Sequence, residues 1–350
     1  MVWRVSFSGH ATAPFFCKSL LHNALERDGA ATEGRSNKTQ PLTTQQLTSI
    51  GENLSFFIGE LLDKLSINSI IKKSTQHTFG VFKMVKFSAA NTKLKKLYKL
   101  ADTTLAQWLD RKVGRSKAKV YSFDLLSGVD CPFAHECRSR AVVNDNGSRS
   151  IQDGVFTKFR CFSASQEVLF TNTFNSRKRN HDDIHALPDC NAMADALLDA
   201  LPADAGVVRI HVSGDFFNAE YFKAWMIVAS CRPEVLFYAY TKSLQYWVAH
   251  RGMVPSNMVL TASRGGRDDD MIEQHSLRSA KVVFSVAEAE ALGLEIDNDD
   301  SHASNPAIRD NDFALLIHGV QPKGSEAADA LKLLKTKKVR HSYSRKAAGV

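Results

Sequence analysis

The sequence has few cysteines and no long apolar run. Six cysteines are scattered over 350 residues, which argues against a disulfide framework. No apolar segment is long enough to span a bilayer. The first 21 residues, MVWRVSFSGHATAPFFCKSLL, make a poor secretory signal because Ser, Gly and His interrupt the apolar stretch. The sequence therefore predicts a cytoplasmic protein without membrane contact, whose thiols stay reduced.

Acidic residues are also fewer than basic ones, 37 against 45, which leaves a net charge of +8. Part of this charge lies in KLKKLYK (93–99) and in KTKKVRHSYSRK (335–346). Such basic segments can attract nucleic acid. A solvated surface and a frayed terminus explain the charge more simply.

Three regions are expected along the chain. Residues 1–83 are rich in Ser, Thr, Asn and Gln, and helical spacing of apolar residues is confined to 54–65. We expect 1–83 to be an N-terminal extension, flexible or a lone helix, or sequence upstream of a natural start at Met84. The compact domain is predicted at 84–335, followed by a basic tail at 336–350.

Strand-like and helix-like segments alternate through the predicted domain. Near-continuous apolar strands followed by helices are typical of a parallel sheet that helices cover, and steps of 20 to 30 residues suit βα units. The α/β class follows, with a full or partial (β/α) barrel of about six parallel strands favoured over an open doubly wound sheet. Asn218 and Ser325 are expected to cap two of the helices. The predicted strands are 118–126, 206–214, 234–241, 256–263, 280–286 and 312–319.

Polar residues follow several of these strands. In both architectures the loops at the carboxyl ends of the strands form the reactive end of the fold. A set of polar groups there is costly to bury without a purpose, so a shared pocket is favoured over separate helix caps. The catalytic candidates are Lys242, His211 and His318, and the candidates for cofactor binding are Ser213, Gly214, Asp215 and Arg264.

Three cysteines lie near the first strand. Cys131 and Cys137 lie in DCPFAHEC (130–137), directly after that strand, and Cys161 follows in KFRCFSAS. Three thiolates leave one position open on a tetrahedral zinc, or one unique iron on a four-iron cluster. His135 as a fourth ligand would make the site structural. Cysteines are also often simply buried small hydrophobes, and the residues alone leave these alternatives open.

The motifs FSAANTKLKKL, YSFDLLSGVDCPFAHEC, DGVFTKFRCFSAS, RIHVSGDFFNAEYFKAWMIVA, LFYAYTKSL and TASRGGRDD together resemble the phage "gene product 88" family over about residues 85–335. The resemblance implies a phage or prophage protein in the cytoplasm of the bacterial host. It supplies a context rather than an activity. Where members of that family tend to carry a further cysteine-rich stretch, this chain has DNDDSHASNPAIRDND, so a second metal site is not expected.

A looser resemblance is to radical S-adenosylmethionine enzymes, whose partial barrel carries three cysteines after its first strand. By that similarity Cys131, Cys137 and Cys161 would bind a [4Fe-4S] cluster, and Gly214 with Asp215 would hold the amine of S-adenosylmethionine. The usual tight spacing of the three cysteines is absent. This likeness concerns the fold level only.

Three functional hypotheses follow from these observations. The first is a metal- or iron–sulfur-binding enzyme with its pocket at the strand ends, using a [4Fe-4S] cluster with S-adenosylmethionine, or zinc. The second is a nucleic-acid-binding protein with a structural zinc, in which Tyr98 and Trp108 would stack on bases. The third is a metal-free enzyme acting on nucleotides or phosphorylated substrates through Arg264 and Lys242.

Overall fold

One largely parallel sheet organises the chain. The computed structural model describes residues 85–308 and 310–339, so the predicted extension 1–83 and most of the tail 336–350 lie outside the described residues. The strands of the main sheet are β1 (Ser88–Ala89), β4 (Lys119–Phe123), β7 (Ala205–Ile210), β8 (Leu236–Thr241), β9 (Met258–Ser263), β10 (Ser279–Val283), β11 (Glu295–Ile296) and β12 (Phe313–Leu316). They are ordered β1-β4-β7-β8-β9-β10-β12-β11 across the sheet.

Six strands, β4, β7, β8, β9, β10 and β12, are neighbours in chain order and pair in parallel. This confirms the six predicted strands. A doubly wound sheet would reverse its strand order at a switch point, and these six show no reversal. The prediction of a full barrel is wrong, because β12 pairs with β11 and β4 pairs with the antiparallel β1, so that the sheet stays open.

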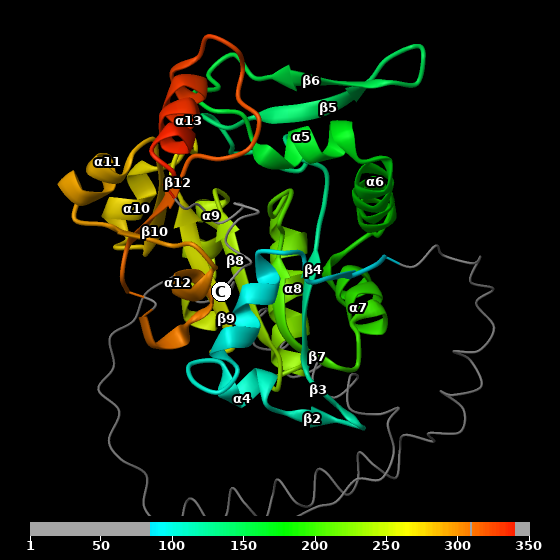
Figure 1. The fold of residues 1–350 in the computed structure, drawn as a ribbon. Helices are drawn as coiled ribbons and strands as arrows, with labels where there is room; N and C mark the ends of the chain where they lie inside the picture. Colours follow the sequence, from blue (N-terminus) through cyan, green and yellow to red (C-terminus); the bar gives the residue numbers. More distant parts are fainter. Residues whose placement is uncertain (1–84, 309, 340–350) are drawn as a thin grey trace, which may run out of the picture. The chain divides into compact units, whose positions relative to one another are not determined.

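Helices cover both faces of the sheet (Figure 1). Strand β7 is buried at all six positions, so it needs apolar cover on each side. Among the described residues, no helix is long and apolar enough to cross a membrane. The helical segments are η1 (Leu94–Leu100), α4 (Ala106–Leu109), α5 (Phe162–Leu169), α6 (Thr171–His185), α7 (Cys190–Ala200), α8 (Ala219–Cys231), α9 (Leu244–Ala249), η2 (Arg251–Met253), α10 (Asp270–Gln274), α11 (Val286–Ala291), α12 (Ser301–Ser304), η3 (Pro306–Ile308) and α13 (Glu326–Thr336).

Alternate side chains of each strand pack on different layers. On one face, Leu94 and Leu97 of η1 join Val207 and Tyr238 of the sheet in one apolar cluster. On the other face, Trp225 of α8 packs edge-on against Phe123 of β4, with ring centroids 5.5 Å apart. The face that would line a barrel is therefore filled by η1, α4 and α12.

Local capping signals behave as the sequence predicts. The side chain of Asn218 accepts a hydrogen bond from the backbone N–H of Tyr221 at 2.8 Å and begins α8. Ser325 accepts one from Ala328 at 3.2 Å and begins α13. Each cap satisfies a backbone donor that the first turn of a helix leaves free.

Two antiparallel hairpins were not predicted. The short one is β2 (Lys112–Val113) with β3 (Ser116–Lys117), and the longer one is β5 (Ser139–Val143) with β6 (Arg149–Asp153). The β5–β6 hairpin packs on α5, and both lie beyond the carboxyl ends of the parallel strands, at the top of Figure 1. The β5–β6 hairpin and α5 therefore cover the end of the sheet where the candidate residues lie.

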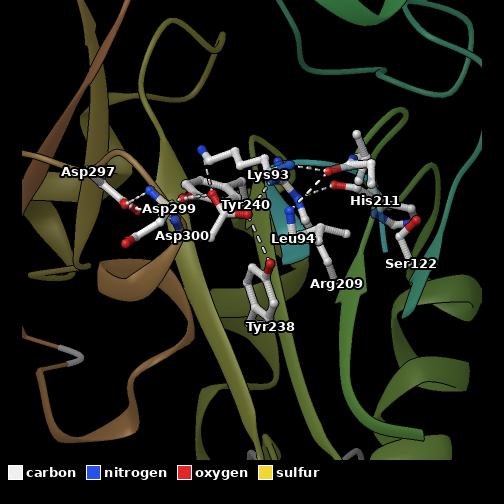
Figure 2. A network of polar contacts seen from close by, with 12 residues as sticks. Lys93, Leu94, Ser122, Arg209, His211, Tyr238, Tyr240, Asp297, Asp299 and Asp300 are labelled. Atoms are coloured by element: carbon white, nitrogen blue, oxygen red, sulfur yellow. Dashed lines mark hydrogen bonds and ion pairs between the residues drawn. The ribbon is translucent and has the colours of Figure 1, made fainter. Parts of the chain in front are cut away.

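A buried ionic network joins η1 to the sheet (Figure 2). The Asp300 carboxylate lies 2.6 Å from Nζ of Lys93 and 2.5 Å from a guanidinium nitrogen of Arg209, and the Tyr238 hydroxyl donates to it at 2.9 Å. Burial alone would raise the pKa of Asp300, but Arg209 and Lys93 hold that pKa well below its usual range. The network thus fixes η1 and the segment before α12 against one face of the sheet.

The basic segment 93–99 contributes to the core. Lys93 is 4% exposed, and Leu94 and Leu97 are fully buried. The Tyr98 hydroxyl accepts a hydrogen bond from the backbone of Val120 at 3.0 Å, and Trp108 is buried. The stacking role proposed for Tyr98 and Trp108 in nucleic-acid binding therefore has no support in this arrangement.

Replacing Asp300 with Asn is expected to lower the free energy of unfolding by about 3–5 kcal/mol, because Lys93 and Arg209 would remain buried without a counter-charge. Urea unfolding followed by circular dichroism measures this loss. The control is Lys117→Ala, which breaks a surface pair with Asp110 in which both side chains are more than half exposed. An unfolding midpoint for Asp300→Asn equal to that of the control would contradict the role assigned to the network.

Candidate functional site

Three thiols meet at the carboxyl ends of the parallel strands. Cys131, Cys137 and Cys161 are each half-buried, yet their sulfurs lie deep enough that burial is the main cause of their raised pKa values, about 11 for Cys161. Asp215 and the other two thiols raise the pKa of Cys131 further, and Lys242 lowers that of Cys137. Because such charge effects act only over short distances, these five predicted residues lie in the same neighbourhood.

The loop that carries Cys131 and Cys137 is held by backbone hydrogen bonds to the segment after β9. The N–H groups of His135 and Glu136 both donate to the carbonyl of Gly265, at 3.2 and 3.0 Å. Gly128 has a φ of +66°, and a Cβ there would lie 2.4 Å from the carbonyl oxygen of Ser139, so only glycine fits at this position. The loop is thus fixed between the end of β9 and the start of β5.

Cys161 is the N-cap residue of α5 and directly precedes Phe162, the first residue of that helix. Backbone hydrogen bonds from Ser163 and Ala164 lower the pKa of the Cys161 thiol and partly offset its burial. The Ser163 hydroxyl donates to the carbonyl of Val212 at 3.0 Å. This contact ties the start of α5, and with it Cys161, to the end of β7.

The three sulfurs do not form a compact metal site. Tetrahedral zinc at about 2.3 Å from each sulfur would hold the sulfurs about 3.8 Å apart. Among the described residues, one group of three or more ligand atoms lies within 4.8 Å of one another, and that group consists of Asp130, His181 and His185. The cysteine arrangement therefore does not match a single zinc ion as it stands.

Asp215 is buried and already accepts three hydrogen bonds. Its carboxylate accepts from the hydroxyl of Thr241 at 2.6 Å and from the backbone N–H groups of Lys242 and Phe216, each at 2.7 Å. Burial raises the pKa of Asp215 to about 6, although these donors lower it. The side chain joins the loop after β7 to the end of β8.

Lys242 has a similar joining role. Its Nζ donates to the carbonyl oxygens of Ser263 and Arg264 at 2.6 and 2.7 Å, and to the hydroxyl of Ser263 at 2.8 Å. All three donors of the ammonium group are thus used within the fold. The predicted catalytic lysine holds the ends of β8 and β9 together.

Ser213 and Gly214 contact the protein itself. The Ser213 hydroxyl donates to Oε1 of Glu167 at 3.0 Å. Gly214 has a φ of +87°, and a Cβ there would lie 2.6 Å from Cβ of Leu125. The glycine is therefore required by the close approach of Leu125, whereas the sequence suggested the approach of a ligand.

His211 and His318 lie in different surroundings. His211 is 3% exposed, has a φ of +70°, and makes a 3.0 Å contact from Nε2 to the hydroxyl of Tyr221. Burial lowers its pKa to about 3, so the imidazole is neutral. The ring of His318 packs against Phe162, with centroids 4.8 Å apart. Of these two predicted catalytic residues, only His318 neighbours the start of α5.

Arg264 is engaged with acidic and polar groups. Its guanidinium lies 2.7 Å from Glu273 and donates to the hydroxyl of Ser279 at 2.9 Å. It lines a cleft of about 480 Å³ together with Glu136 and Lys158. Glu273 and Ser279 thus already bind the guanidinium of Arg264, which the sequence suggested would bind a cofactor.

A buried pair that the sequence analysis missed lies beside the thiols. Glu167 is 1% exposed and accepts hydrogen bonds from the backbone and hydroxyl of Ser127, at 3.0 and 2.7 Å, and from Arg177 at 3.0 Å. Ser127, Glu167 and Arg177 come from separate elements. Glu167 and Arg177 are ten residues apart, whereas side chains that meet on one helix are three or four residues apart. No local signal could have identified this pair.

A second cleft, of about 380 Å³, lies under the β5–β6 hairpin and was also missed. Its lining includes Arg138, Arg140, Arg267, His135 and Phe156. His135 stacks on Phe156 with ring centroids 4.5 Å apart, so this histidine is committed to the cleft. Among the described residues, the guanidinium groups of Arg138 and Arg267 have no ion-pair partner.

The protein-family model described as Gene product 88 matches residues 85–338. No curated protein and no solved structure matches the chain.

The buried His211 is expected to make stability depend on pH. Its pKa is about 3 in the folded protein and about 6.5 in the unfolded chain, so only the unfolded chain gains a proton as the pH falls below about 6.5, and stability drops there. His211→Asn removes this titration, and asparagine tolerates the positive φ. Between about pH 7.5 and pH 5, the parent should lose about 2 kcal/mol more than the variant.

Urea unfolding of both proteins at the two pH values gives the comparison. Asp215 titrates near pH 6 in the folded protein, in the opposite sense, but it is present in both chains and cancels. Equal losses in the two proteins would show that His211 does not stay neutral on folding.

Proposed function

The chain belongs to the phage gene product 88 family, and we propose that it is an enzyme built around an iron–sulfur cluster held by Cys131, Cys137 and Cys161. The observation that carries this proposal is the meeting of the three thiols with Asp215 and Lys242 at the carboxyl ends of the strands. In open α/β sheets that edge is where ligands bind.

The three sulfurs are not all within 4.8 Å of one another, as they would be around one zinc ion, whereas a cluster does not require this. In a cluster each thiolate binds a different iron, so the sulfurs lie further apart than around one zinc ion. His135, which the sequence offered as one possible fourth ligand, is stacked on Phe156. Three cysteines without a fourth ligand leave one iron of a four-iron cluster free to bind substrate.

The chain supplies groups that favour thiolates. Lys242 lowers the pKa of Cys137, and backbone N–H groups at the start of α5 lower that of Cys161. Burial has the larger opposite effect, so the thiols stay protonated until a cation is bound. The cluster would supply the electron-transfer chemistry, and these residues would orient and stabilise its ligands.

The proposal does not extend to S-adenosylmethionine. The Asp215 carboxylate already accepts three hydrogen bonds from the fold. Gly214 packs against Leu125. Neither residue supplies the open acidic turn that the amine of S-adenosylmethionine would need.

Protein purified without oxygen is expected to be coloured and to contain iron and acid-labile sulfide. Replacing Cys131, Cys137 or Cys161 singly with Ala should remove most of the iron, whereas Cys231→Ala, at the end of α8, should retain it. Metal analysis and visible absorption measure both. Far-UV circular dichroism verifies that each variant is folded. Colourless protein with unchanged metal content across the four variants would rule out the cluster.

A second candidate function concerns phosphate-bearing ligands. The cleft under the β5–β6 hairpin has three arginines, and its acidic residue, Asp153, is paired with Arg160 at 2.5 Å. Phe156 is 64% exposed, so a flat base could stack on it. Arginine without an acidic partner is well suited to phosphate, because its planar group makes two parallel hydrogen bonds. We propose that a nucleotide or phosphorylated substrate binds there.

ATP is the probe for this cleft. The double variant Arg138→Ala/Arg267→Ala should weaken ATP binding at least ten-fold in calorimetric titration, since it removes both unpaired guanidinium groups. The charge-matched control is the double variant Lys112→Ala/Arg115→Ala in the β2–β3 hairpin, where both side chains are exposed. If the Arg138→Ala/Arg267→Ala variant binds ATP as tightly as the control does, the cleft is not a phosphate site.

A further inference from the structure

Two histidines of α6 and one buried carboxylate converge on a single point. His181 and His185 are four residues apart, so they lie on the same face of the helix. Nδ1 of His181 and Nε2 of His185 each lie 2.8 Å from the same oxygen, Oδ1 of Asp130. All three ligand atoms lie within 4.8 Å of one another. Asp130 opens the DCPFAHEC motif after the first predicted strand, whereas neither histidine was singled out from the sequence.

We propose that Asp130, His181 and His185 form a second metal site that binds a divalent transition-metal ion. A metal at about 2.0–2.2 Å from each ligand atom separates adjacent ligands by about 2.9 Å in octahedral and about 3.4 Å in tetrahedral geometry. The observed 2.8 Å separations are close to the octahedral value. Two of the three separations therefore already suit an ion, and the third, between the two nitrogens, is within 4.8 Å.

The carboxylate is fixed before any ion binds. Asp130 is 1% exposed, and its Oδ2 accepts a hydrogen bond from the backbone N–H of Leu126 at 2.9 Å. Its own carbonyl accepts from the N–H of Asp215 at 2.8 Å. Contacts of this kind orient metal ligands and raise the affinity of a site.

The imidazole rings are also held in place. His185 stacks on Phe217 with centroids 3.9 Å apart, and Phe217 in turn stacks on Tyr221 at 4.6 Å. The side chains of His181 and His185 are 23% and 37% exposed. The site is thus rigid on its protein side and open to solvent on the other, where water or a substrate oxygen could complete the coordination.

The donor set selects the class of ion. Two imidazole nitrogens and one carboxylate oxygen suit Zn²⁺, Fe²⁺, Co²⁺ or Ni²⁺, whereas Mg²⁺ and Ca²⁺ prefer oxygen ligands alone. The site is independent of the proposed thiol centre. Although Cys131 directly follows Asp130, its thiol interacts with Cys137 and Cys161, while the carboxylate of Asp130 turns to α6.

Co²⁺ titration of the full chain with Cys131, Cys137 and Cys161 replaced by Ser tests the site apart from the thiols. We expect one Co²⁺ to bind with visible d–d absorption, to be displaced by Zn²⁺, and to be unaffected by Mg²⁺. Adding His181→Ala and His185→Ala should lower the Co²⁺ affinity at least ten-fold. The matched control carries His250→Ala and His275→Ala instead and should keep the parent affinity.

A second measurement avoids substitution altogether. In the unaltered chain, Zn²⁺ should protect His181 and His185 from diethyl pyrocarbonate, as measured by mass spectrometry, and should leave His250 and His275 as reactive as before. Absence of protection, or Co²⁺ affinity unchanged by the His181 and His185 substitutions, would overturn the second metal site. Iron retained by the His181→Ala/His185→Ala variant would show that the thiol centre stands separately.

Discussion

Buried carboxylates hold the loops at the carboxyl end of the sheet. A carboxylate taken out of water is costly unless several donors surround it. Glu167 therefore accepts hydrogen bonds from Ser127, Ser213 and Arg177. Asp215 accepts them from Thr241 and Lys242 and so joins the loop after β7 to the end of β8. Removing any one of these acids would leave donors from different elements unpaired, so the geometry of the whole edge depends on them.

The same edge carries three protonated thiols, which is an unusual arrangement for a structural core. Each thiol has a raised pKa because burial disfavours its charge, and at Cys131 the other two thiols and Asp215 add to that effect. An environment of this kind resists thiolates until a cation compensates them. Lys242 and the N–H groups at the start of α5 would help to stabilise the thiolates. Their effect on the pKa values is smaller than that of burial, so they do not ionise the thiols alone.

Positive charge is divided between structure and surface. Lys93 and Arg209 neutralise Asp300 inside the protein, at one face of the sheet. Arg138 and Arg267 lie around a cleft whose acidic residue is already paired. The net charge of the chain therefore says little about its partners, because what matters is which cations lack a counter-charge within the fold.

The sequence by itself determined the six parallel strands and the caps at Asn218 and Ser325, because apolar runs and capping residues are local signals. It also placed Asp215, Lys242 and the thiols at one edge, since parallel strands gather their carboxyl ends. Only the tertiary structure decided that the sheet stays open, because β1 and β11 have two residues each and carry too little pattern to be recognised. The tertiary structure alone decided which groups already have partners within the fold. The contacts of Lys242 with its acceptors, and those of Asp130 with His181 and His185, join segments more than 20 residues apart. Such segments come together only through packing.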